Sequence, residues 1–339
     1  MRSRIPVLFV LLTAACARET DNPFANSGST TAPPADAEIA FVSVPSGGVA
    51  RDLFSVDESG SPVTRLTACN REGRPCEVLE TAFSPERARL MLRRRTEDTN
   101  ADGRLSAADG ESLVFTDLAR GTEKVLVEGT QRVSGVDWGP AGSRVVYSAL
   151  GEGNREDMFV MDPNGSNADR LTATADIDER RPRIDPTGSV AIYERIEGSG
   201  KGRIFLYLNA AQTAQQAITQ GGEGTERLTG TPYTVGSDAD PDYAPDGRTI
   251  VFRRLTSTGN GGLGNWDLMT VKPDGTDLRV VAGGPGYRGA ADWGPLGIVF
   301  AETDGTGQVR VVVIGNDGTR RTPVTAVAAS LLQYPRWLP

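Results

Sequence analysis

The feature that most constrains this sequence is a short motif that occurs six times: an aromatic or aliphatic residue, then any residue, then proline. The six copies are Phe83-Ser84-Pro85, Trp138-Gly139-Pro140, Ile184-Asp185-Pro186, Tyr243-Ala244-Pro245, Trp293-Gly294-Pro295 and Trp337-Leu338-Pro339. Successive prolines are 55, 46, 59, 50 and 44 residues apart. A repeat of about 45 residues with insertions is typical of a β-propeller, in which each repeat forms one blade.

The segments after each proline have the pattern of a four-stranded blade. A tight turn leads to a second strand, at 90–92, 145–147, 190–193, 250–252 and 298–300. A third strand follows at 113–115, 158–161, 204–207, 266–269 and 309–313. We expect a short fourth strand at the Arg-Leu-Thr segments 65–67, 170–172 and 227–229. Four short strands joined by tight turns are one propeller blade.

The two ends of the repeat array complement each other. Residues 38–67 hold three strands without a proline motif in front, and the last proline motif, at 337–339, has no strands behind it. We therefore expect the C-terminal strand to become the innermost strand of the first blade, which removes the open sheet edges. The sequence predicts an all-β fold, a six-bladed β-propeller over residues 38–339.

Composition excludes several classes of function. The 339 residues include 40 glycines, 21 prolines and no histidine. Without histidine, Ser-His-Asp and Cys-His catalysis and histidine-ligated metals are excluded. The formal net charge is −8 without a basic tract, which argues against nucleic-acid binding.

The N-terminus resembles an export signal. Arg2 and Arg4 precede an apolar stretch at 5–12 that is too short to span a bilayer, and Cys16 follows in a sequence similar to a bacterial lipobox. We expect residues 1–15 to be a signal peptide, Cys16 to be lipidated, and 16–37 to form a flexible tether. Ala17, and not an aspartate, follows the cysteine, which by resemblance to lipoproteins implies sorting to the outer membrane in a host with two membranes. The alternative is ordinary cleavage that leaves a soluble exported protein.

A calcium-loop motif interrupts one repeat. Residues 98–109 match the twelve-residue loop of EF-hand and dockerin type, with an apolar residue at position 8. The expected ligands are Asp98, Asn100, Asp102, the carbonyl of Arg104, Ser106 through water, and Asp109, while Gly103 permits the sharp turn. Asp109 stands where glutamate is usual. The alternative is an acidic surface loop without metal.

Two cysteines remain after Cys16. Cys69 and Cys76 are seven residues apart between the first two blades. In an exported protein such a pair favours a disulfide, and two thiols without histidine are too few ligands for a metal site.

Six aspartates lie just before or within the expected innermost strands: Asp137, Asp178, Asp238, Asp240, Asp242 and Asp292. In a propeller we expect these positions to approach one mouth of the central channel, where carboxylates can bind a cation, a basic peptide or a sugar. The alternative is that they cap turns and strand ends. Trp138, Trp293 and Trp337 recur at one repeat position, which favours a place in the core between blades.

The repeat resembles that of TolB-like propellers, also described as the PD40 or WD40-like repeat. The resemblance is carried by Arg170-Leu171-Thr172 with Asp185-Pro186 and by Ala244-Pro245-Asp246-Gly247, and it covers nearly all of 38–339. TolB proteins carry an α/β domain before the propeller, whereas here only 17–37 precede the first blade, so that domain's role is not expected. The resemblance implies an envelope protein partner, with a peptidoglycan-associated lipoprotein as a candidate.

Two functions remain open. The first is a non-catalytic envelope protein that docks a protein or glycan on one propeller face. The second is a hydrolase, a lactonase or a glycan-acting enzyme, that uses channel carboxylates. No G-x-S-x-G motif is present. A pair of converging buried carboxylates with raised pKa values would favour the hydrolase.

Overall fold

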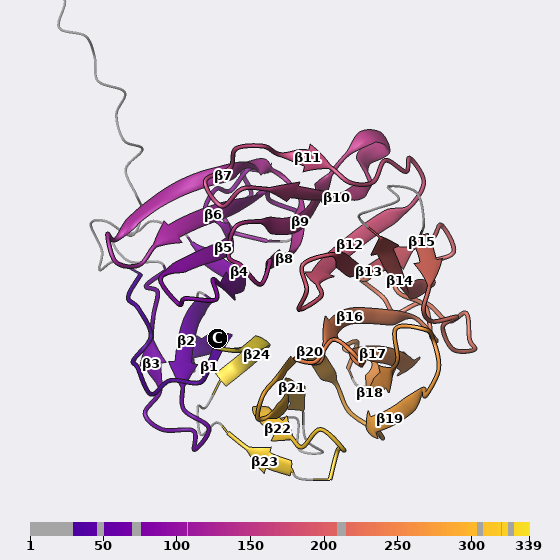
Figure 1. Cartoon of the computed structure of the whole chain (residues 1–339). Coiled ribbons are helices and arrows are strands. Elements are labelled where there is room, and N and C mark those ends of the chain that lie inside the picture. Colours follow the sequence, from indigo (N-terminus) through magenta and orange to yellow (C-terminus); the bar gives the residue numbers. More distant parts are fainter. Residues whose placement is uncertain are drawn as a thin grey trace, which may run out of the picture.

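The computed structural model describes residues 30–45, 51–69, 76–106, 108–208, 215–259, 261–303, 308–319, 321–324 and 329–339. They form six four-stranded antiparallel sheets arranged in a ring, and the innermost strand of each sheet faces the propeller axis (Figure 1). The fold is a six-bladed β-propeller, as predicted. One turn of 3-10 helix, Glu152–Asn154, is the helical segment within the described residues.

The first three blades contain the following strands, from the innermost strand outward. Blade 1 has β24 (Ala329–Trp337), β1 (Ile39–Pro45), β2 (Asp52–Val56) and β3 (Thr64–Arg65). Blade 2 has β4 (Glu77–Phe83), β5 (Arg89–Arg95), β6 (Glu111–Asp117) and β7 (Thr122–Gln131). Blade 3 has β8 (Val133–Trp138), β9 (Val145–Leu150), β10 (Glu156–Met161) and β11 (Asp169–Arg170).

The other three blades follow the same order. Blade 4 has β12 (Asp178–Ile184), β13 (Val190–Ile196), β14 (Gly202–Leu208) and β15 (Gln215–Ala217). Blade 5 has β16 (Asp238–Tyr243), β17 (Ile250–Ser257), β18 (Asn265–Val271) and β19 (Arg279–Ala282). Blade 6 has β20 (Arg288–Gly294), β21 (Gly297–Thr303), β22 (Val309–Ile314) and β23 (Arg321–Pro323).

The C-terminal strand closes the ring. β24 pairs antiparallel with β1, with Trp337 opposite Ile39, and the Leu338 N–H donates to the Glu38 carbonyl at 2.7 Å. Arg87 of the neighbouring blade donates to the carbonyls of Leu338 and Pro339 and, at 3.2 Å, to that of Ala37. The two ends of the propeller are thus held by one arginine as well as by the strand pair.

Buried aliphatic and aromatic side chains fill the space between blades. The indole N–H of Trp138 donates to the Ala82 carbonyl in the preceding blade at 2.9 Å, and that of Trp337 donates to the Gly297 carbonyl at 3.0 Å. Both tryptophans are buried in inter-blade clusters, as predicted. Trp293 is only half-buried: it packs against the cluster between blades 5 and 6, and its indole N–H donates to Asn316 of its own blade at 3.0 Å.

Two of the Arg-Leu-Thr segments join the outermost strand of a blade to the third strand of the same blade. In blade 3, Arg170 donates from Nη2 to Asp157 at 2.6 Å and from Nε to the Thr172 carbonyl, and the Thr172 hydroxyl accepts the Met158 N–H at 2.9 Å. Arg65, Asp52 and Thr67 repeat this arrangement in blade 1.

The third Arg-Leu-Thr segment was wrongly predicted to be a fourth strand. The outer strand of blade 4 is β15, which is followed by Thr219, whose hydroxyl accepts the Ile204 N–H at 3.0 Å. Residues 227–229 lie instead in the connection to blade 5, where Arg227 forms an isolated bridge with Thr234. Blade 4 is followed by a long insertion, so two segments compete for the outer position. The segment at β15 pairs with β14, whereas 227–229 pairs with no described strand of the blade.

The expected leader, Cys16 and most of the tether lie outside the described residues. Residues 30–37 belong to the predicted tether, and they lie against the propeller: the Thr31 N–H donates to the Leu66 carbonyl at 3.0 Å, and Thr30 donates to Glu123 at 3.3 Å. Within the described segments, no helix has the length and apolar character needed to cross a membrane.

Candidate functional site along the propeller axis

A backbone irregularity recurs near the middle of the innermost strands. The pairing with the second strand shifts register at Gly135, Arg181 and Asp240, and β24 shifts opposite β1 at Tyr334. These four residues have positive φ values of 57°, 52°, 52° and 48°. A left-handed residue in a bulge redirects its side chain out of the normal alternation, and bulges of this kind are frequent beside functional sites.

Three of these bulge residues meet one another. Arg181 donates from Nη1 to Asp240 and from Nη2 to the Tyr334 hydroxyl at 3.0 Å, so side chains from blades 4, 5 and 1 are joined. Arg253 donates to the other oxygen of Asp240 and lies 4.0 Å from the Trp266 ring centroid. Burial raises the pKa of Asp240, but the two guanidinium groups outweigh it and lower this pKa to about 2. Asp240 is therefore ionised at neutral pH, where its charge joins Arg181 and Arg253.

Glu80 forms a second centre beside the first. Its carboxylate is fully buried and lies among four guanidinium groups, those of Arg93, Arg181, Arg183 and Arg336. It accepts hydrogen bonds from the Gly135 N–H at 3.1 Å and from Arg183 at 3.3 Å. Burial raises the pKa of Glu80, but its arginine neighbours lower it to about 2. We call these two centres together the axial cluster: Glu80, Arg93, Arg181, Arg183, Asp240, Arg253, Tyr334 and Arg336.

Three of the predicted aspartates join consecutive innermost strands. Asp137 accepts the Ile184 N–H at 2.9 Å, and Asp242 and Asp292 accept the N–H groups of Trp293 and Trp337 at 2.8 Å each. Each carboxylate thus satisfies a backbone donor of the next blade. Burial raises the pKa of Asp137, in spite of Arg183. Burial together with the charge of Asp292 raises the pKa of Asp242 to about 8.

The six aspartates do not gather at one mouth, contrary to the prediction. Asp137, Asp242 and Asp292 lie near the ends of their strands, and Asp240 is in the middle of β16. Asp178 and Asp238 begin β12 and β16, at the opposite end of the axis, where they pair with Arg155 at 2.9 Å and with Arg254 at 2.5 Å. The innermost strands that carry these aspartates run along the axis for six or seven residues, so aspartates at the start and at the end of a strand lie at opposite ends of the axis.

A pocket of 550 Å³ lies at the end of the propeller where the innermost strands begin. We call it the entrance pocket. Its walls come from blades 2, 3 and 4 and from the connection to blade 5, and its charged lining residues are Arg93, Asp109, Glu111, Arg132, Asp178 and Arg180. Thr99, Ala108 and Gly110, in and next to the predicted calcium loop, form one wall.

The predicted calcium loop connects β5 to β6 at this pocket. Asp98 accepts the N–H groups of Asp102 at 3.1 Å and Gly103 at 2.6 Å, and Gly103 has a φ of 84°. Asp109 accepts N–H groups from Ser106 at 2.7 Å and Asn100 at 3.2 Å. Burial opposes ionisation of Asp109, but these hydrogen bonds outweigh it and lower its pKa. Position 107 lies outside the described residues.

The carboxylates of Asp98, Asp102 and Asp109 accept hydrogen bonds from backbone N–H groups of their own loop. Across the described part of the protein, no three acidic or thiol side chains converge as a metal site would require. The donor set of Asp98, Asn100, Asp102 and Asp109 nevertheless consists of the oxygen ligands that calcium prefers. These four side chains all lie within residues 98–109, the loop that forms one wall of the entrance pocket.

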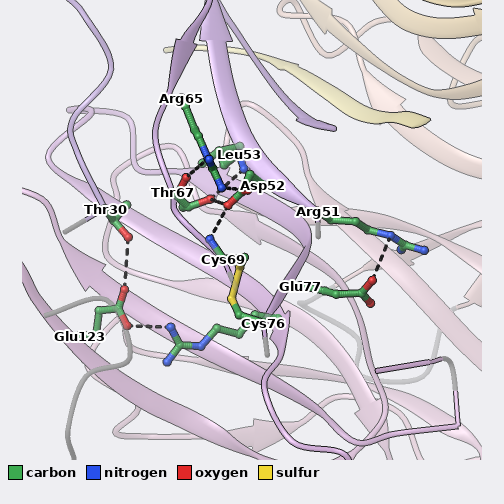
Figure 2. Close-up of a disulfide and its surroundings, with 11 residues drawn as sticks. Thr30, Arg51, Asp52, Leu53, Arg65, Thr67, Cys69, Cys76, Glu77 and Glu123 are labelled. Carbon is green, nitrogen blue, oxygen red and sulfur yellow. Dashed lines mark hydrogen bonds and ion pairs between the residues drawn. A yellow bond between two sulfur atoms is a disulfide. The ribbon is translucent and has the colours of Figure 1, made fainter. Parts of the chain in front are cut away.

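Cys69 and Cys76 form the predicted disulfide, with an S–S distance of 2.03 Å (Figure 2). It joins the end of blade 1 to the start of β4. The Cys69 N–H donates to Asp52 at 2.7 Å, so the disulfide is attached to the same carboxylate that holds Arg65 and Thr67. Both cysteines are buried.

Sequence reasoning missed the basic half of the axial cluster. Arg181, Arg183 and Arg336 occupy the innermost strands at positions comparable to those of the aspartates. An alignment of the six repeats would have revealed these arginines. Arg183 and Arg336 directly precede the aromatic or aliphatic residue of the proline motif. In other blades the same position is occupied by an aspartate: Asp137, Asp242 or Asp292.

Several solved structures have a fold similar to that of this protein. TolB from Acinetobacter baumannii is similar with a TM-score of 0.67 and 17% identity, over 89% of this protein and 67% of that one. A protein described as putative TolB from Agrobacterium tumefaciens has a TM-score of 0.58 and 15% identity, over 90% and 99%. A puromycin-hydrolyzing peptidase from Mycobacterium tuberculosis has a TM-score of 0.54 and 13% identity, over 83% and 42%. The sequence matches no protein-family model and no curated protein.

The fold and the axis define a class: a closed six-bladed β-propeller whose axis is occupied by an ion-pair cluster. Within that class the architecture is TolB-like, as the repeat predicted. Because identities are below a fifth, this likeness concerns the fold, and function has to be argued from the site.

Proposed function

We propose that the protein is a non-catalytic binding protein of the cell envelope, which docks a protein or glycan partner at the end of the propeller that carries the entrance pocket. The observation that carries this proposal is the way in which the axial charges are used. Glu80 and Asp240 are held ionised by arginines, and Asp137, Asp242 and Asp292 accept backbone N–H groups of the next blade. Groups engaged in this way join blades and are poorly placed to transfer protons.

The entrance-pocket end offers what a docking surface needs. Four segments from different blades border the pocket, and the long 218–237 connection, the predicted calcium loop and the disulfide-closed connection all leave the sheets at this end. Loops on a rigid scaffold are the usual carriers of recognition. A peptidoglycan-associated lipoprotein remains a candidate partner by analogy with TolB.

We further propose a structural calcium ion in the 98–109 loop, bound by Asp98, Asn100, Asp102, the Arg104 carbonyl, Ser106 and Asp109. The ion would replace the N–H donors as the partner of the carboxylates and fix one wall of the entrance pocket. Anchoring through a lipid on Cys16, export by residues 1–15 and an outer-membrane location complete the proposal.

One observation favours the hydrolase alternative. The pKa of Asp242 is raised to about 8 next to Asp292, which is the electrostatic pattern of a carboxylate pair that shares a proton. Both carboxylates, however, have an oxygen engaged by a backbone N–H. Activity against lactones or glycans that is lost in Asp242→Asn would favour this alternative over docking.

The proposal is tested by crosslinking in the native host followed by pull-down of the tagged protein. We expect one envelope protein or glycan-bearing species to be recovered reproducibly and to be lost when the loop 230–232 is replaced by glycine and serine. An unrelated lipoprotein serves as the control. If the same species are recovered with the control, or with the replaced loop, the docking proposal is wrong.

A further inference from the structure

Two arginines of the entrance pocket share one carboxylate oxygen. Arg180 Nε is 3.2 Å and Arg132 Nη1 is 3.7 Å from Oε1 of Glu156, which begins β10. The Glu156 side chain is fully buried, and its other oxygen accepts a hydrogen bond from the Ser134 hydroxyl. Both guanidinium groups therefore approach the same carboxylate oxygen, and Arg132, Arg180 and Glu156 together carry one unit of positive charge.

The hydrogen-bond donors of this pair are not used up by the protein. Arg132 has half of its side chain exposed and makes no hydrogen bond from it to a described residue. Arg180 contacts Glu156 through Nε, and its two terminal nitrogens have no hydrogen-bond acceptor among the residues that the structure describes. Both residues line the entrance pocket, so these donors are available to a ligand there.

The carboxylates of the same pocket are fully engaged. Both oxygens of Glu111 accept from Arg93 and Arg95, at 3.0 and 2.8 Å. Asp178 accepts from Arg155 at 2.9 Å and from the Glu156 N–H at 3.1 Å. The Asp109 oxygens accept N–H groups from its own loop. The pocket therefore has unused donors on one wall and no unused acidic oxygen among these residues.

We propose that Arg132 and Arg180 form a binding site for a carboxylate group of a peptide. The proposal rests on the proposed docking function and names the chemistry that the entrance pocket recognises. Arg132, Arg180 and Glu156 together have one excess positive charge, which one carboxylate group of a peptide would neutralise. Val133, Leu150 and Pro232 give the remaining wall an apolar surface for the adjoining peptide. Arginine forks are the usual partners of carboxylates.

The carboxylate has two possible sources, the C-terminus of a peptide or an acidic side group within one. Three acetylated tripeptides distinguish them: trialanine with a free C-terminus, Ala-Glu-Ala with an amidated C-terminus, and amidated trialanine as the neutral probe. Each is titrated against the purified protein in calcium-containing buffer by ligand-observed NMR. We expect at least one carboxylate probe to bind about tenfold more tightly than the neutral probe. Equal binding of all three, or no binding, would overturn the proposal.

Two variants locate the site. Arg132→Gln is expected to remove the tenfold preference, and because Arg132 is exposed, this variant should fold normally. Arg180→Gln is expected to act in the same direction. The matched control is Arg120→Gln, a surface arginine with an 80% exposed side chain in the β6–β7 turn at the other end of the blade. A carboxylate preference that survives in Arg132→Gln would contradict the proposal, whatever Arg180→Gln does.

The outcome is separable from that of the proposed function. If the crosslinked partner is recovered while no carboxylate probe binds, the carboxylate site is wrong and docking stands. If a carboxylate probe binds through Arg132 but no partner is recovered from the host, the pocket chemistry stands and envelope docking is wrong.

Discussion

The backbone of Gly135 in blade 3 lies against that of Arg181 in blade 4: a Cβ on residue 135 would be 2.2 Å from the Arg181 Cα. Gly135 also has a φ of 57° and donates its N–H to Glu80 of blade 2. One glycine thus allows three blades to approach one another at the axis, where the Arg181–Asp240–Tyr334 contacts are made. Only glycine satisfies both the conformation and the close approach.

Gly135→Ala is therefore expected to destabilise the propeller strongly. The added methyl overlaps backbone rather than a flexible side chain, and alanine is strained at positive φ. We expect the free energy of unfolding in urea to fall by about 2–4 kcal/mol. Gly139→Ala is the control, because its nearest neighbour would be 3.5 Å away and its φ is not left-handed. Equal urea midpoints for the two variants would contradict the close-approach argument.

Stability is expected to depend on pH through Asp242. Burial and Asp292 raise its pKa to about 8 in the folded state, above the usual value of 3.8. Between these values the folded protein holds a proton that the unfolded protein has released, so stability falls as pH rises from about 4 to 8. Asp242→Asn keeps an oxygen for the Trp293 N–H and should reduce this fall.

Urea midpoints at a series of pH values between 5 and 8 check this expectation. Asp246→Asn, in an exposed turn of the same blade, is the control and should keep the wild-type slope. Glu80 and Asp240 do not interfere in this range, because their pKa values near 2 confine their effect to more acidic solutions. Parallel profiles for wild type and Asp242→Asn would show that Asp242 is ionised at neutral pH.

The fold was predictable because its signals are local and repeated. Proline motifs, tight turns and strand-like runs define each blade, and the unmatched C-terminal motif defines the closure. The disulfide was predictable because few cysteines leave one pairing. The axial cluster was not predictable, because it depends on bulges at Arg181, Asp240 and Tyr334 that turn side chains from different blades toward each other. The Arg-Leu-Thr segment at 227–229 shows the converse: a local signal without a partner strand does not form a strand.

The Cys69–Cys76 disulfide is expected to stabilise the connection between the first two blades. A disulfide that closes a loop of this length reduces the conformational entropy of the unfolded protein, which stabilises the folded protein by about 2.5 kcal/mol. The double variant Cys69→Ser/Cys76→Ser should lower the urea-derived stability by about this amount. The oxidised wild type and a reduced, alkylated sample provide the comparison. Identical midpoints in all three samples would mean that the disulfide contributes nothing to stability.

Calcium is expected to raise the melting temperature, because a ligand that binds only the folded protein stabilises it, by about 2.7 kcal/mol at a concentration one hundred times its Kd. Asp102→Ala removes one proposed ligand and should abolish the increase, whereas Asp176→Ala, an exposed aspartate outside the loop, should retain it. Scanning calorimetry with calcium and with chelator measures both. Superimposable melts of the wild type in the two conditions would show that the loop binds no calcium.

The central claim is that partners bind the end of the propeller at which the innermost strands begin. Site-specific photo-crosslinking tests it most directly, with the probe at Ala108, an exposed residue of the entrance pocket, or at Thr187, an exposed residue of the turn that ends β12 at the other end. We predict that the probe at Ala108 yields a discrete adduct in the native envelope and that the probe at Thr187 does not. An adduct from Thr187 alone, or none from either position, would contradict the claim.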